Sequence, residues 1–233
     1  MSSADGRPTM TSDTGWEVDH LVVGAADLAQ GAAWCRATFG VEPAAGGAHP
    51  FMGTHNRLLS IASAAYPRSY LEIIAIDPRA PPPGRVRWFD LDAAAVQAAL
   101  QHGPALLHWV ARCNDVEAAR RALAGAGVDR GEILAAERAI PQGLLRWRIS
   151  VREDGQRLAR GALPTLIEWA GPHPAERLPA SGVGLQQLSL RGLPDGVQSM
   201  LPAGVAADPN PATVALSACF ETPRGRIELA SRV

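Results

Sequence analysis

The stretch that decides the fold is VDHLVV, residues 18–23, because residues 106–112, LLHWVAR, repeat its character. Both runs are rich in the apolar and β-branched residues that are typical of strands. Each carries one histidine in a mostly apolar setting, His20 in the first and His108 in the second. The sequence therefore predicts two copies of one structural unit, each beginning with a strand that holds a histidine.

The residues that follow keep the same order in both copies. An aspartate comes seven positions after each histidine and opens a helical pattern, at Asp27 and at Asp115. β-like runs follow each helix, and the last run of each copy holds one glutamate, Glu72 in YLEIIAI and Glu168 in PTLIEWA. The order β-α-β-β-β therefore occurs twice. It predicts an α+β fold of paired βαβββ modules with an extra β-rich segment at the C-terminal end.

The segments around these copies suggest how the chain is divided. We expect a disordered tail at 1–14, modules at 15–78 and 106–174, a proline-rich connector with a helix at 79–105, and a β-rich segment at 175–233. The last segment contains LQQLSL, VALSACF and RIEL with no helical pattern between them. One interpretation is a degenerate third module, in which Gln187 and Glu228 take the places of the histidine and the glutamate.

Composition narrows the classes of partner. The net charge is −1 and the isoelectric point is near 6.6, so neither a nucleic acid nor a membrane surface is expected as a partner. The three cysteines form no C-x-x-C pair, which argues against a disulfide framework or a thiolate metal site. The N-terminal residues lack the apolar core of a signal peptide. We expect a cytoplasmic protein that acts on a small molecule.

The duplicated histidines and glutamates are the candidate chemical groups. Burying an ionised carboxylate costs on the order of several kcal/mol of folding free energy unless the group is paired or bound to a metal. If the two copies pack around a pseudo-twofold axis, two imidazoles and two carboxylates converge, a ligand set that suits Zn²⁺, Ni²⁺, Co²⁺, Mn²⁺ or Fe²⁺. The alternative is that each glutamate faces solvent and each histidine is an ordinary hydrogen-bonded residue.

The sequence resembles the vicinal oxygen chelate superfamily, and within it the glyoxalase-like proteins, over residues 16–172. The resemblance rests on the paired modules, on the D-H-L opening at 19–21, and on the Y-L-E and L-I-E-W closing strands. It implies two curled sheets that face each other around a cavity, where a substrate chelates a divalent metal through two oxygens. Carried over by position, the metal ligands are His20, Glu72, His108 and Glu168.

The chain also departs from the compact glyoxalase I enzymes, by its connector and by its C-terminal segment. Residues 49–59, HPFMGTHNRLL, instead resemble a branch of glyoxalase-like proteins that largely lack assigned reactions. In this segment His55 and Asn56 are candidate substrate-binding residues, although the motif is also good turn chemistry. Arg146 and Arg148 share one face of a predicted strand, which is either a cavity face that binds an anionic substrate or a solvated outer face. His102 and His173 are expected at the surface.

Three functions are compatible with these residues. The first is a metal-dependent lyase or isomerase, in which the ion polarises a carbonyl oxygen and Glu168 moves a proton at the adjacent carbon. The second is a non-catalytic protein that binds a small molecule in the same cavity. The third is an Fe²⁺ extradiol-type dioxygenase, which needs two histidines and one carboxylate. The two modules either build the site within one chain or exchange between chains in a homodimer.

Overall fold

The computed structural model describes residues 14–140, 143–212 and 214–232, so the predicted tail lies almost wholly outside the described residues. The first repeat comprises β1 (Glu17–Gly24), α1 (Leu28–Phe39), β2 (Ala44–His49), β3 (Thr54–Ser60) and β4 (Tyr70–Ile76). The second comprises β5 (Ala105–Arg112), α3 (Val116–Gly125), β6 (Glu132–Ile140), β7 (Gly143–Val151) and β8 (Thr165–Ala170). The connector contains α2 (Ala94–His102), and the C-terminal strands are β9 (Gly184–Arg191), β10 (Val205–Asp208), β11 (Leu216–Thr222) and β12 (Gly225–Ala230). The predicted pairing of βαβββ modules is confirmed.

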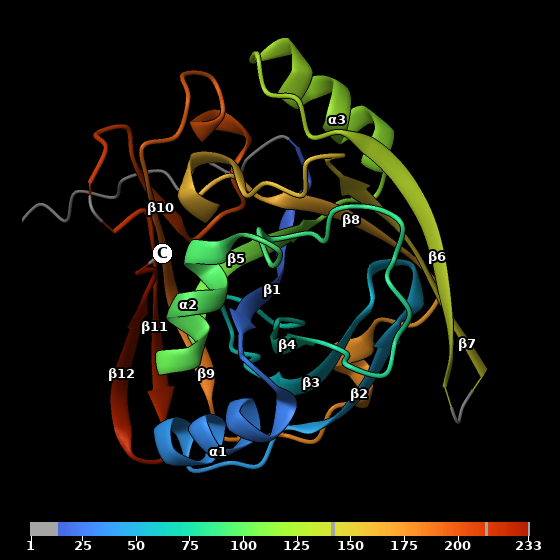
Figure 1. The fold of residues 1–233 in the computed structure, drawn as a ribbon. Helices are drawn as coiled ribbons and strands as arrows, with labels where there is room; N and C mark the ends of the chain where they lie inside the picture. The colour runs from blue at the N-terminus through green and yellow to red at the C-terminus, as the bar shows by residue number, and fades with distance from the viewer. Residues whose placement is uncertain (1–13, 141–142, 213, 233) are drawn as a thin grey trace, which may run out of the picture.

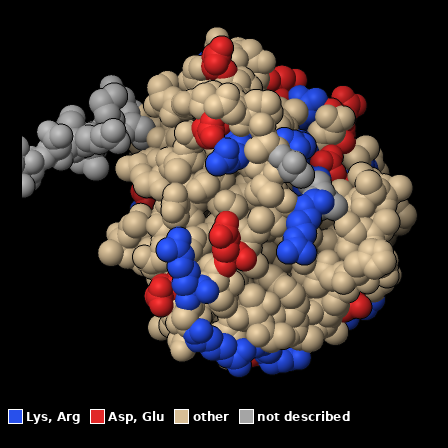
Figure 2. Space-filling model, turned by 90° about the vertical axis from the view of Figure 1, so that its left-hand side faces the viewer, with Lys and Arg blue, Asp and Glu red and all other residues tan. Residues whose placement is uncertain are grey.

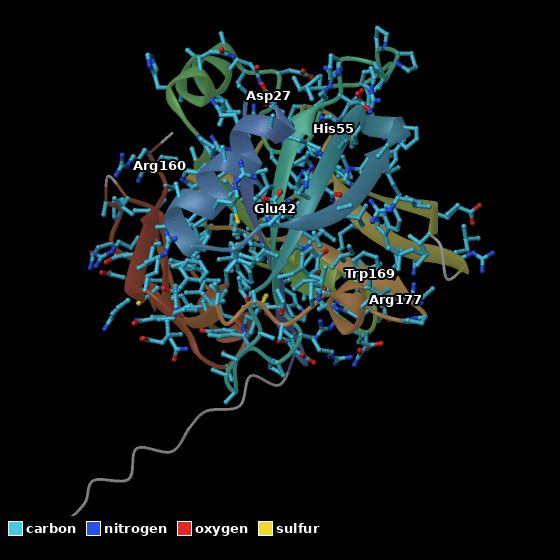
Figure 3. The ribbon with its side chains drawn as sticks, turned by 90° about the horizontal axis from the view of Figure 1, so that it is seen from below. Asp27, Glu42, His55, Arg160, Trp169 and Arg177 are labelled. Atoms are coloured by element: carbon cyan, nitrogen blue, oxygen red, sulfur yellow. The ribbon has the colours of Figure 1, made fainter. Side chains whose placement is uncertain are left out.

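Matching caps begin the first helix of each repeat. Asp27 lies at the start of α1 (Figure 3). Its side chain accepts a hydrogen bond from the backbone N–H of Gln30 at 2.7 Å, and Asp115 accepts one from the N–H of Ala118 at 2.9 Å. Such N-caps satisfy amide groups that the helix leaves unpaired. The first helix ends at Gly40, whose left-handed φ of 76° suits a residue without a side chain. The spacing between histidine and aspartate therefore reflects a real structural repeat.

One continuous sheet joins the two modules. Its eight strands have the order β2-β3-β4-β1-β5-β8-β7-β6. The first strand of each module runs parallel to the last strand of the same module, and β1 and β5 pair antiparallel at the centre. The sheet curls until its two edges approach each other. Their closeness is evident at Gly47 on β2, where an added Cβ would lie 2.6 Å from Nη1 of Arg138 on β6.

Each face of this sheet has its own hydrophobic core. On the convex face, Leu21 and Trp109 pack with the helices of the repeats and with the second sheet, which has the order β10-β9-β11-β12 and lies to the left in Figure 1. On the concave face, Val22 packs with Trp88 and Phe89 of the connector, and α2 adds Val96 and Leu100 to the same core. The concave side is therefore partly filled by the connector.

The C-terminal β-rich segment is confirmed, and β10 is a strand that the sequence patterns did not predict. Its sheet pairs β9 with β10 and with β11, while β12 pairs with β11. The interpretation of this segment as a degenerate third module stays a prediction. Tyr66 ties it to the first module by donating a hydrogen bond to the carbonyl of Gly204 at 2.6 Å.

The surface and the cysteines have no unusual features in the described residues. Basic and acidic side chains are interspersed on the face that Figure 2 shows. No helix in residues 14–140, 143–212 or 214–232 is long and apolar enough to cross a membrane. Cys35, Cys113 and Cys219 are free and buried.

The contact between the second sheet and the first module predicts a large effect of one substitution. Phe220 on β11 is fully buried and meets Phe39 of α1 edge-on, with ring centroids 5.3 Å apart. Because Phe220→Ala leaves a cavity there, we expect it to lower the free energy of unfolding by about 3–5 kcal/mol in urea titrations. Leu144→Ala, at a position 39% exposed, is the control, and a similar loss in both variants would contradict this packing.

Candidate functional site

A small cavity on the concave side of the eight-stranded sheet is lined in part by polar side chains. Strand pairing explains the grouping, since Tyr70 lies opposite His20 and Glu72 opposite Leu58, which places these side chains on one face. The polar lining consists of His20, His49, Asn56, Tyr70, Glu72 and Arg138. The rest is apolar or aromatic: Leu58, Trp88, Phe89, Leu145, Trp147, Ile149, Ile167, Trp169 and Pro174.

Glu72 is the central acidic group of the cavity. Its side chain is buried, and Oε1 accepts a hydrogen bond from Nδ2 of Asn56 at 2.6 Å. Nε2 of His20 lies 3.6 Å from Oε2, and Nε2 of His49 lies 4.0 Å from Oε1. Two imidazoles and one amide therefore surround a carboxylate that is removed from bulk water.

Asp19 fixes the orientation of His20. Its Oδ1 lies 2.6 Å from Nδ1 of His20, and its Oδ2 accepts a hydrogen bond from Nε1 of Trp169 at 2.9 Å. Nε2 of His173 lies 2.8 Å from the same Oδ2, so the expectation that His173 is a surface residue was wrong. Although burial raises the pKa of Asp19, hydrogen bonds from His173 and His20 outweigh burial and hold it well below the usual value. Because Asp19 is an ionised acceptor, His20 carries its proton on Nδ1 and presents Nε2 to Glu72.

His49 is a neutral imidazole at the end of β2. Its Nδ1 lies 3.1 Å from the hydroxyl of Thr54, and its ring meets Trp88 and Trp147 edge-on. Burial, together with the positive charge of Arg138, lowers the pKa of His49 to about 3. The imidazole of His49 therefore stays neutral above about pH 4.

The second module does not reproduce this arrangement. Val22, two positions after His20, pairs with Glu72, whereas Val110, two positions after His108, pairs with Thr165. By sheet register, Thr165 occupies the position that corresponds to Glu72. Nε2 of His108 accepts a hydrogen bond from the Thr165 N–H at 3.1 Å and lies 3.0 Å from its hydroxyl. The cavity therefore has its acidic group on one module only.

Glu168 lies on the opposite face of the sheet. Its Oε2 accepts a hydrogen bond from the N–H of Val116 at 2.9 Å, at the start of α3, and lies 3.5 Å from Nη1 of Arg148. The structure thus brings His20 and Glu72 together and places His108 and Glu168 among other partners. In the described parts of the chain, no group of three or more His, Cys, Asp and Glu residues forms a ready-made metal site. Metal binding by the four residues together stays a prediction.

Of the residues predicted to bind substrate, Asn56 lines the cavity and the other three lie elsewhere. Nδ1 of His55 is 3.7 Å from Asp77 on the other face of β3, and Figure 3 shows His55 well apart from Trp169. Arg146 binds Glu137 at 3.2 Å and Arg148 binds Glu117 at 3.1 Å, both on the outer face. The position of the two arginines corresponds to the second interpretation of their strand, an outer face.

Arg138 and His49 are cavity residues that the sequence analysis did not select. Arg138 pairs with Leu145 across the β6–β7 hairpin, and directly opposite residues share a face, so it points inward. The sequence carries a signal for it, because Arg138 interrupts an apolar stripe of alternate residues, Leu134, Ala136 and Ile140. His49 is the first residue of the HPFMGTHNRLL segment, and no sequence pattern marks it as a cavity residue.

A single curled sheet of paired βαβββ modules around a cavity defines a member of the vicinal oxygen chelate superfamily. More narrowly, the chain belongs to the family of the glyoxalase-like domain, whose sequence model matches residues 18–202. The match spans both repeats and extends through β9. The comparison with curated proteins gave no match.

Several solved structures are similar to this chain at low sequence identity. A hypothetical protein from Staphylococcus aureus is 16% identical, with a TM-score of 0.52 over 76% of this chain and 69% of that one. A methylmalonyl-CoA epimerase from Streptomyces coelicolor in complex with 2-nitronate-propionyl-CoA is 21% identical, with a TM-score of 0.42 over 67% and 96% of the two chains. The methylmalonyl-CoA epimerase from Mycobacterium tuberculosis is 16% identical, with a TM-score of 0.40 over 73% and 97%.

The buried histidines predict a loss of stability in mild acid. Burial holds the pKa of His108 well below the usual value, so between about pH 6.5 and the folded pKa the unfolded chain binds a proton that the folded chain does not. Stability is therefore complete above about pH 6.5 and falls below it, by at most about 1.4 kcal/mol per pH unit for each such histidine. We expect His108→Gln to flatten this slope in urea titrations between about pH 6.5 and 5. The same slope in both proteins would show that His108 is not responsible.

Proposed function

We propose that this protein is a glyoxalase-like lyase or isomerase that moves a proton at a carbon next to a carbonyl group of a small molecule, with Glu72 as the base. The observation that carries this proposal is the position of the Glu72 carboxylate, buried and 3.6 Å from Nε2 of His20 in a cavity with aromatic walls. A carboxylate that lines a cavity and lies within reach of a bound substrate is a suitable general base.

The hydrogen bonding of Glu72 supports a division of labour between its two oxygens. Asn56 Nδ2 donates to Oε1, and Oδ1 of Asn56 in turn accepts a hydrogen bond from the N–H of Gly47 at 2.8 Å. Among the described residues no hydrogen bond engages Oε2. Oε1 thus anchors the carboxylate, while Oε2 is the oxygen available to take a proton.

His20 is held in a fixed orientation beside the Glu72 carboxylate. Its ring stacks on Tyr70 with centroids 4.6 Å apart, and Asp19 holds its Nδ1. Nε2 of His20 therefore keeps a fixed position beside Oε2 of Glu72, where its lone pair can bind the implied metal ion.

A divalent metal ion is the cofactor that the superfamily resemblance implies. Three groups of the cavity are of the types that bind one, although in the described residues they do not converge into a ready-made site. Nε2 of His20 and Nε2 of His49 both face the Glu72 carboxylate. The other nitrogen of each imidazole is held by an oxygen, from Asp19 and from Thr54, as is usual for metal-binding histidines. When bound, such an ion supplies a Lewis acid for the carbonyl oxygen.

The assignment of the base predicts different effects of two glutamate substitutions. In D₂O, with small keto acids such as pyruvate and acetoacetate as probes, we expect deuterium incorporation by the wild type, measured by NMR. Glu72→Gln should lower its rate about 10²–10⁴-fold, because the acceptor of the proton is lost. Glu168→Gln should retain the rate and lose about 1 kcal/mol of stability, because it weakens the cap of α3.

The reverse result, with exchange abolished by Glu168→Gln and retained by Glu72→Gln, would show that the predicted role of Glu168 is the right one. Absence of exchange in the wild type, together with small-molecule binding that survives EDTA, would instead favour the non-catalytic binding function. The aromatic side chains of Trp88, Phe89, Trp147 and Trp169 in the cavity wall are what would support such binding.

The proposed metal ligands predict a stabilising effect of the right ion. We expect purified protein to carry a divalent metal in elemental analysis, and the stripped protein to gain about 2.7 kcal/mol of stability at an ion concentration 100 times the Kd. Zn²⁺, Ni²⁺, Co²⁺, Mn²⁺ and Fe²⁺ are compared by thermal unfolding. His49→Ala should remove the gain, whereas His102→Ala, at the exposed end of α2, should keep it. No gain with any of the five ions would refute the metal site.

A further inference from the structure

Arg138 reaches into the cavity without a partner for part of its guanidinium group. Its Nε and Nη1 are buried and form no hydrogen bond with the described residues. It is the basic side chain among the residues that line the cavity, apart from the histidines. Buried donors on a cation are costly to leave unmatched, so a cation presented in this way is suited to receive an anion.

Two adjacent glycines on the opposite edge of the sheet make room for the side chains of Arg138 and Asn56. A Cβ at Gly47 would lie 2.6 Å from Nη1 of Arg138 and 2.7 Å from its Cδ. A Cβ at Gly46 would lie 2.0 Å from Oδ1 of Asn56, the residue that anchors Glu72. The Gly46–Gly47 pair therefore leaves space for the arginine and for the amide at once, and side chains there would push both out of position.

The electrostatic surroundings of Arg138 include one carboxylate, that of Glu72, which does not contact it. Burial lowers the pKa of Arg138, and the negative charge of Glu72 partly offsets this effect, so the two groups are electrostatic neighbours. No ion pair within 4.0 Å joins them among the described residues, in contrast to Arg146 on the same hairpin, which binds Glu137. In the described residues, no protein carboxylate therefore neutralises the charge of Arg138 by direct contact.

We propose that Arg138 binds a carboxylate group of the substrate and thereby restricts the site to small carboxylic acids. The inference rests on the proposed function for the identity of the ligand as a substrate, but the binding itself does not require turnover. A carboxylate held by Arg138 places the neighbouring carbon toward Glu72 and His20, and such positioning is a main source of catalytic rate.

The test measures binding of two acids and their uncharged esters: pyruvate against methyl pyruvate, and malonate against dimethyl malonate. Quenching of tryptophan fluorescence reports on the cavity, because Trp88, Trp147 and Trp169 line it. EDTA is present throughout, so that a bound metal does not contribute. We expect the wild type to bind at least one acid more tightly than its ester.

Arg138→Gln should weaken binding of that acid about tenfold or more and leave the ester unaffected, because a charge-assisted hydrogen bond is lost. Arg138→Lys should recover part of the affinity. Arg146→Gln, on the outer face of the same hairpin, is the matched control and should bind like the wild type. Gly47→Ala keeps the charge but displaces the guanidinium, so it should weaken binding in the same direction, with folding checked by circular dichroism.

Equal affinity of Arg138→Gln and the wild type for both acids would overturn the proposal, as would a wild-type preference for the esters or no saturable binding of either acid. Deuterium exchange, measured for the wild type and for Glu72→Gln beside the binding of acids, distinguishes a failure of this inference from a failure of the proposed function. If the wild type shows no deuterium exchange but binds acids in a manner that depends on Arg138, the proposed reaction fails and the carboxylate site stands. If exchange depends on Glu72 while Arg138→Gln changes neither binding nor exchange, the proposed reaction stands and the carboxylate site fails.

Discussion

The buried negative charge of Asp19 is the interaction on which the arrangement of the site depends. Asp19 belongs to the first strand, whereas two of its hydrogen-bond partners, Trp169 and His173, belong to the end of the second module and the turn after it. A fully buried carboxylate is tolerated only when its lone pairs are matched. Its partners therefore hold the two modules in register at the point where the side chain of His20 is oriented.

The duplication accounts for the architecture but not for the symmetry of the chemistry. Both modules supply a buried histidine from their first strand, yet the position opposite is Glu72 in one and Thr165 in the other. In the second module Arg130 donates a hydrogen bond to the Thr165 hydroxyl at 2.5 Å, close to His108. A cation stands near His108 where a carboxylate stands near His20. In the part of the chain that the structure describes, only the first module thus places a carboxylate beside its histidine.

Much of the fold was predictable because it depends on local signals. The caps at Asp27 and Asp115, the alternation of the strands and the order of elements follow from short stretches of sequence, and the structure confirms them. The site was predictable only in part, since matching Glu168 with Glu72 by its place in a strand ignored which face it points to. Pairing register between distant strands decides that face, and a shift of one residue reverses it. Arg138 interrupts an apolar stripe in the sequence, but only its pairing with Leu145 shows that this stripe faces the cavity.

The meeting of the sheet's two edges also bears on how a ligand enters. Strands β2 and β6 are the ends of the strand order and share no ladder of backbone hydrogen bonds, so what lies between them is the stem of Arg138 resting over Gly47. Side-chain rotations of this kind are fast compared with the breaking of a sheet. Widening this seam would break no backbone hydrogen bond between β2 and β6, because the two strands are not paired with each other. A movement of this one side chain would therefore change the contact between the two edges, whereas a barrel closed by hydrogen bonds all round would first have to break the pairing of two strands.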